Sequence, residues 1–165
     1  MMPVEIVVED DRWQKIAIEA LCSKAFETTL VTIGLAPARF NVEILACDDK
    51  KITELNHEFR GKATPTNVLS WPSLERGAFK DGEMPRRPAE GIEPDLGDIA
   101  IAYETCTREA RQLGKPHAEH VLHLIVHATL HLLGYDHQRD QDATLMERTE
   151  VMVLGKLGVG DPYSL

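Results

Sequence analysis

The sequence predicts an α+β fold in a single compact domain, residues 1–165. Its length of 165 residues suits one domain with one hydrophobic core. Short runs with strand character are interspersed with segments of helical periodicity. One of these segments, residues 119–133, is apolar on nearly every side, which is typical of a helix buried at the centre of a domain.

The first half of the chain predicts two strands, each followed by a helix. Residues 4–8 form a β-branched run, and apolar residues then recur at helical spacing over residues 13–21 behind an aspartate cap. Residues 40–47 begin with alternating apolar and polar residues, which predicts the second strand. The apolar face of the next helix spans residues 52–59, and Gly61 is suited to end it.

Two further strands are predicted at residues 67–71 and 96–102. The connection between them, residues 72–95, holds four prolines, three glycines and six acidic residues. Connections of this length without regular structure are typically lids, binding loops or disordered segments. We expect a flexible loop that contributes little to stability.

The remaining sequence predicts three helices. A polar helix over residues 103–113 ends at Gly114. The apolar segment 119–133 forms the central helix, and Asp140 is expected to cap a last amphipathic helix.

Composition restricts the class of function. A chain with 43% hydrophobic and 27% charged residues is an ordinary globular protein. Its net charge of −9 excludes a general nucleic-acid coat protein, so any contact with RNA or DNA is local. The three cysteines are odd in number and far apart, which favours a reducing compartment, the cytoplasm. The apolar runs are too short for a membrane span.

Histidine is concentrated in one part of the chain, with five of the seven residues between positions 117 and 131. His127 and His131, at i and i+4, can point two imidazoles at one metal ion. Gly134 can end the helix in a left-handed conformation and bring His137 back toward this pair. Three nitrogen ligands leave a fourth position open to water, as in catalytic zinc sites.

Other residues of this segment have plainer interpretations. A lone HxxxH pair is more often a pair of satisfied core histidines than a metal site, and the residues that follow His131 shift this balance for His127 and His131. His120 and His123, a turn or two earlier, are interpreted as hydrogen-bonded histidines of the wall. Asp136 either orients an imidazole or caps the turn.

Residues 127–137 read HATLHLLGYDH and resemble the signature of the YbeY family, bacterial metal-dependent endoribonucleases of ribosomal RNA maturation. The resemblance extends to Leu55, Asn56, Arg60 and the segments 66–72 and 97–99.

The resemblance implies a small mixed sheet flanked by helices, with the metal held on the central helix. It implies one Zn²⁺ per chain, bound by His127, His131 and His137, with Arg60 as a further essential residue. These four are the expected catalytic residues. Arg60 is expected to bind phosphate oxygens of the substrate, assisted by Lys62.

The implied activity is cleavage of single-stranded RNA in ribosomal RNA processing, including 3′ end maturation of small-subunit rRNA, and in ribosome quality control. The expected partners are single-stranded or ribosomal RNA and the small ribosomal subunit or its assembly factors. Attack by metal-activated water and attack by the substrate's own 2′-hydroxyl both fit these residues.

Two other functions fit the histidine pattern. The first is a zinc hydrolase of peptide or amide bonds, which Ala128 disfavours because helical zinc peptidases place a glutamate base there. The second is a noncatalytic ribosome-assembly factor with a structural zinc, which the open fourth coordination position disfavours.

Three positions depart from the family pattern. Ala128 replaces the usual glycine and adds a methyl group close to the metal. Asn67 replaces the usual aspartate, which removes a charge and retains the capacity to form a turn. Trp71 replaces phenylalanine and enlarges an apolar wall.

Overall fold

The computed structural model describes residues 3–164, so Met1, Met2 and Leu165 of the predicted domain lie outside the described residues. A four-stranded mixed sheet runs in the order β1-β2-β4-β3. β2 is parallel to β1 and β4, whereas β3 is antiparallel to β4. The strands are β1 (Val4–Val8), β2 (Asn41–Cys47), β3 (Val68–Pro72) and β4 (Asp95–Ala102). The α+β fold with a small mixed sheet is therefore confirmed.

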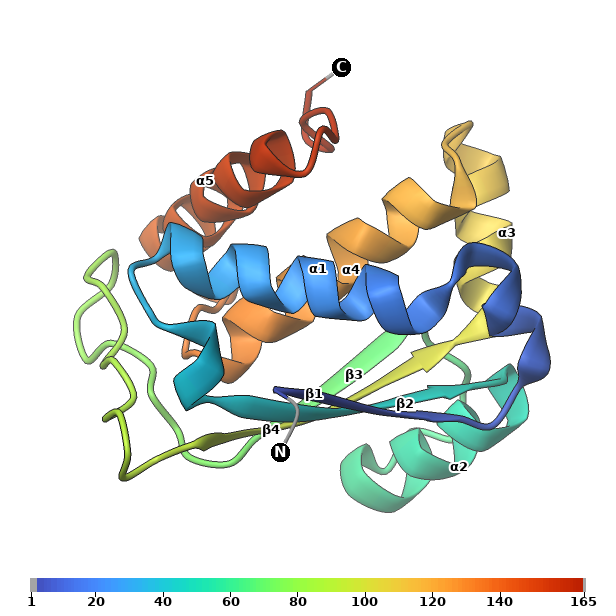
Figure 1. Ribbon diagram of the computed structural model, residues 1–165, viewed down its shortest axis with the longest axis horizontal. Coiled ribbons are helices and arrows are strands. Elements are labelled where there is room, and N and C mark those ends of the chain that lie inside the picture. The colour runs from blue at the N-terminus through green and yellow to red at the C-terminus, as the bar shows by residue number, and fades with distance from the viewer. Residues whose placement is uncertain (1–2, 165) are drawn as a thin grey trace.

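The sheet has helices on both faces (Figure 1). α1, α4 and α5 lie on one side and α2 lies on the other, while α3 packs against α4. Because both of its faces are covered, the inner strand β4 is nearly all buried. The α-helices are α1 (Ile18–Thr32), α2 (Asp49–Arg60), α3 (Tyr103–Leu113), α4 (His117–Leu132) and α5 (Asp140–Lys156).

Two apolar clusters fill the spaces on either side of the sheet. The larger contains Phe26 of α1, Ile44 of β2 and Ile125 of α4. The smaller contains Ile52 of α2 and Leu69 of β3. The predicted central helix is α4, and most of its residues are buried.

The helix predicted over residues 13–21 is interrupted. A 3₁₀ helix, Asp11–Ile16, ends at Ala17, which has a left-handed φ of 50°, and α1 begins at Ile18. Trp13 is fully buried, and its indole nitrogen donates to the carbonyl of Cys47 at 2.9 Å. Helical spacing did not predict the interruption at Ala17, because the contact of Trp13 is with a strand that is distant in the sequence.

The prediction that Asp140 caps the last helix is wrong. α5 begins at Asp140, and the side chain of its N-cap residue, Arg139, makes no capping hydrogen bond. Instead Asp81, from the long loop, accepts hydrogen bonds from the backbone nitrogens of Asp142 at 2.8 Å and Gln141 at 3.3 Å. A carboxylate about sixty residues away in sequence thus supplies the cap.

Residues 73–94 connect β3 to β4 and contain turns and bends without a helix or strand. The segment is nevertheless tied to the rest of the fold. Arg76 is buried and donates to the carbonyl of Leu132, and Arg139 donates to the carbonyls of Ala78 and Phe79. The flexibility of the loop stays a prediction.

Gly134 ends the central helix as expected. Its φ is 98°, and the nitrogen of Tyr135 donates back to the carbonyl of Leu130 at 3.0 Å. A Cβ at Gly134 would lie 2.6 Å from backbone atoms of Arg76, so both the conformation and the packing require glycine here.

Over residues 3–164, none of the helices combines the length and the apolar character needed to cross a membrane.

Candidate metal centre

Three imidazoles come together where α4 ends. The ring centroids of His127 and His137 are 5.3 Å apart, those of His131 and His137 are 5.8 Å apart, and those of His127 and His131 are 6.2 Å apart. The i, i+4 spacing places the first two on one face of α4, and the turn at Gly134 returns the third.

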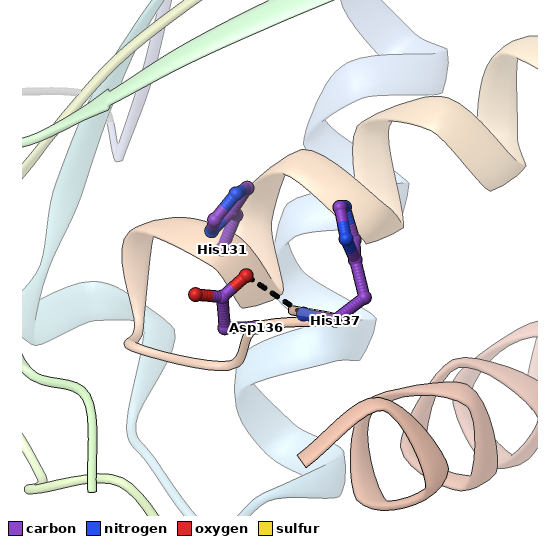
Figure 2. A group of neighbouring side chains, drawn as sticks. All are labelled: His131, Asp136 and His137. Atoms are coloured by element: carbon purple, nitrogen blue, oxygen red, sulfur yellow. Dashed lines mark hydrogen bonds between the residues drawn. The ribbon is translucent and has the colours of Figure 1, made fainter. Parts of the chain in front are cut away.

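Asp136 joins this group. One ligand atom each from His131, Asp136 and His137 lie within 4.8 Å of one another, which makes these residues a possible metal site (Figure 2). The Asp136 carboxylate also accepts a hydrogen bond from the backbone nitrogen of His137 at 2.7 Å. Asp136 therefore contacts the backbone of the turn, and a carboxylate oxygen of Asp136 lies beside the imidazoles of His131 and His137.

Burial lowers the pKa of His131, and the nearby Asp136 carboxylate acts in the opposite direction. The lowered pKa favours the neutral imidazole at neutral pH, which is the form that binds a metal ion.

A fully buried carboxylate stands behind the imidazoles. Glu150 of α5 accepts a hydrogen bond from Nδ1 of His127 at 2.5 Å through one oxygen. Its other oxygen accepts from Nε2 of His123 at 3.0 Å and from the hydroxyl of Tyr163 at 2.5 Å. Burial alone would raise the pKa of Glu150, but the hydrogen bonds from His123, His127 and Tyr163 outweigh it and lower the pKa to about 2.

Neither Glu150 nor Tyr163 was expected from the sequence to be a functional residue. Glu150 stands four residues after Met146 and four before Leu154, both buried, so it falls on the apolar face of its helix. A charged residue on a buried face needs a partner, and this was the signal that could have revealed it. Tyr163 carries no comparable signal in the sequence.

His120 and His123 are hydrogen-bonded residues of the wall, as expected. Nε2 of His120 lies 2.9 Å from Glu109, and His123 is bound to Glu150. The possible metal site formed by His131, Asp136 and His137 includes neither of them, and it does not include His127, whose ring lies next to those of His131 and His137.

The imidazoles open onto a groove of about 840 Å³. Its lining includes Arg60 of α2, Trp71 of β3 and Glu75 of the long loop. The guanidinium of Arg60 is exposed and has no hydrogen-bond or ion-pair partner within residues 3–164. Lys62 is exposed, two residues further along, and does not contribute to this lining.

A family model described as endoribonuclease YbeY matches residues 5–158. The chain belongs to the endoribonuclease YbeY family. The resemblance carried by residues 127–137 is thereby confirmed, and it extends over nearly the whole chain.

Curated relatives support the same family. The endoribonuclease YbeY of Dinoroseobacter shibae is 53% identical over 162 residues, which are 97% of this chain and 90% of that protein. The endoribonuclease YbeY of Ruegeria sp. (strain TM1040) is 51% identical over 164 residues, 98% and 96% of the two chains. The solution structure of TM1509 from Thermotoga maritima is 23% identical, covers 98% of this chain and 99% of its own, and matches with a TM-score of 0.56, which shows the fold.

Two departures from the YbeY pattern have clear structural settings. The Asn67 side-chain oxygen accepts from the backbone nitrogen of the next residue, Val68, at 2.6 Å. Its amide donates to Glu109 at 3.0 Å, a contact that an ionised aspartate would replace with repulsion. Ala128 is buried and lines the groove beside the imidazoles.

Proposed function

We propose that this protein is a zinc-dependent endoribonuclease that cleaves single-stranded RNA in ribosomal RNA processing. The observation that carries the proposal is the convergence of three imidazoles on the groove, in a chain that belongs to the endoribonuclease YbeY family. His127, His131 and His137 hold one zinc ion per chain, with solvent or substrate in the fourth position.

The donor set fits zinc. Zinc prefers imidazole nitrogens, and metal-binding histidines commonly donate their second ring nitrogen to a carboxylate, as His127 does to Glu150. When bound, zinc supplies a Lewis acid for the phosphodiester and a hydroxide near neutral pH. Asp136, whose carboxylate lies among the possible ligand atoms, orients the turn that carries His137.

Arg60 binds the scissile phosphate in this proposal. Its exposed, unpaired guanidinium faces the groove that holds the imidazoles. A guanidinium donates two parallel hydrogen bonds to phosphate oxygens. Lys62 contributes positive charge next to it and assists substrate binding. The protein has a net charge of −9, so it attracts RNA only where positive side chains such as Arg60 and Lys62 are exposed.

The proposed setting is the cytoplasm, with the small ribosomal subunit or its assembly factors as partners. The proposed roles are 3′ end maturation of small-subunit rRNA and ribosome quality control. The family to which the chain belongs supports this setting. Membership of this family does not favour the two alternatives, a zinc hydrolase of peptide or amide bonds and a noncatalytic ribosome-assembly factor.

The test is cleavage of a labelled single-stranded RNA by zinc-loaded and metal-free protein, with a matched duplex as the control. We expect cleavage of the single strand by the zinc-loaded protein alone. Equal cleavage without metal, or none with it, would contradict the proposal. A substrate with one 2′-deoxynucleotide at the cleaved position separates the two mechanisms, because only attack by the 2′-hydroxyl is lost.

A further inference from the structure

The Glu150 carboxylate accepts hydrogen bonds from three side chains, whereas an ion pair needs only one partner. It is fully buried, yet its two oxygens receive hydrogen bonds from side chains of two different parts of the chain: His123 and His127 on α4, and Tyr163 near the C-terminus. A buried carboxylate is costly to desolvate, and an apolar side chain of similar size often gives equal or greater stability. Packing alone therefore does not explain a glutamate here.

The hydrogen bond to His127 fixes which nitrogen of that imidazole is free. Nδ1 carries the hydrogen that Glu150 accepts at 2.5 Å, so Nε2 is the nitrogen left to bind a ligand. Among the three candidate ligands, His127 is the one whose side chain is hydrogen-bonded to a carboxylate within residues 3–164.

Tyr163 completes the arrangement. Its hydroxyl donates to the Glu150 oxygen that His123 also contacts, and its ring packs edge-on against His123, with centroids 5.9 Å apart. The backbone nitrogen of Tyr163 donates to Asp161 at 2.7 Å, which shapes the turn that brings the ring back to the groove.

We propose that Glu150 is a positioning residue that holds His127 with Nε2 directed at the metal, and that Tyr163 holds Glu150. This inference rests on the proposed function, because it takes His127 as a metal ligand. His123 acts on the other oxygen of the same carboxylate and contributes orientation without binding the ion.

The first experiment measures zinc affinity by competition with a chromophoric chelator. Loss of a carboxylate partner of this kind typically weakens metal binding about 10–100-fold, which we expect for Glu150→Gln. Tyr163→Phe removes one hydrogen bond to the carboxylate and is expected to weaken zinc binding less, by about threefold to tenfold. The matched control is Glu109→Gln, which alters the equivalent contact to His120, a histidine outside the candidate ligands. Its zinc affinity is expected to equal that of the wild type.

The second experiment measures the tautomer of His127 by ¹⁵N NMR of the imidazole, with and without zinc. We expect the Nδ1–H tautomer in the wild type in both states, and a mixture in metal-free Glu150→Gln. If Glu150→Gln does not fold, Tyr163→Phe and the wild-type tautomer still test the proposal. An Nε2–H tautomer in the wild type would overturn it, as would a zinc affinity of Glu150→Gln within twofold of the wild type.

These readouts do not depend on RNA. If the protein binds zinc as expected but fails to cleave RNA, the proposed function fails while the role of Glu150 stands. If RNA is cleaved while zinc affinity and tautomer are unaffected by Glu150→Gln, the role of Glu150 fails and the proposed function stands.

Discussion

Histidines lie along α4 from His120 to His131, and those toward its two ends pair with carboxylates in different surroundings. At the N-terminal end, which we call the closed end because the His120 side chain is buried, His120 meets Glu109, and the amide of Asn67 donates to the same carboxylate. At the C-terminal end, which we call the open end, His127 meets Glu150 through Nδ1, whereas His120 uses Nε2. Here the turn at Gly134 adds His137, and the imidazoles open onto a groove. A histidine paired with a carboxylate is therefore common to both ends. A returning third imidazole and access to solvent distinguish the candidate site.

The largest difference between the two ends is expected in metal binding. His131→Ala removes one of three proposed ligands, so zinc content after dialysis is expected to fall to background and RNA cleavage to be lost. His120→Ala, at the closed end, and His123→Ala are expected to retain zinc. Metal analysis by mass spectrometry checks all three. Undiminished zinc in His131→Ala would remove this residue from the ligand set.

Arg60→Ala is expected to abolish most cleavage while zinc content and folding stay normal. Loss of one preorganised donor to a reacting centre commonly costs about 100-fold or more in rate. Lysine lacks the planar fork, so Arg60→Lys is expected to recover only part of the activity. The measurement is the cleavage rate at matched zinc occupancy. If Arg60 were only a cation at a helix end, both variants would cleave normally, and only Arg60→Ala, which removes the charge, would lose about 0.3–1 kcal/mol of stability.

The turn that distinguishes the open end is tested by Gly134→Ala. The left-handed conformation alone costs a non-glycine residue about 1–2 kcal/mol, and the close approach to Arg76 adds to this loss. Gly155→Ala in α5 is the matched control, because a Cβ there meets nothing within 4 Å. It is expected to stabilise the protein by about 0.5–1 kcal/mol. Urea unfolding gives both values, and equal stabilities would contradict the argument.

Hydrogen exchange tests the loop beside the open end. We expect fast exchange over residues 75–93 without RNA, because the segment has no helix or strand. The amides of Gly82 and Arg86 are expected to exchange more slowly, since they donate hydrogen bonds to Asp142 and Arg76. Protection of the whole segment would contradict the predicted flexibility. Protection that appears only with RNA would identify a lid.

The smallest effect concerns the closed end, where Cys106 lies against the carbonyl of Asn67. Burial raises the pKa of Cys106 far above its usual range, and burial likewise raises the pKa of Cys47 to about 12. Their thiolates are therefore scarce up to pH 9 in the folded protein. Alkylation by iodoacetamide at pH 8 is expected to be at least about 100-fold slower than in denaturant. Rapid labelling of Cys106 in the native protein would show that this end opens.

Much of the candidate site was predictable because its main features are local in sequence. The spacing of His127 and His131, the helix-ending Gly134 and the returning His137 lie within eleven residues, where helical geometry fixes direction. The strands were predictable for the same reason, since alternation and apolar runs report burial over a few residues. The family resemblance rests on the same short segments.

The tertiary structure decided what depends on residues distant in sequence. Glu150 reaches His127 across 23 residues, Asp81 caps α5 across 61, and Trp13 binds Cys47 across 34. Periodicity reports which face of an element is buried but not which element covers it. The sequence by itself therefore determined the α+β class and the approach of His127, His131 and His137 to one another, while their joint binding of a metal stays a prediction. Only the packing of α5 and the C-terminal turn against α4 placed a buried carboxylate behind the imidazoles, because that contact exists only once the chain has folded.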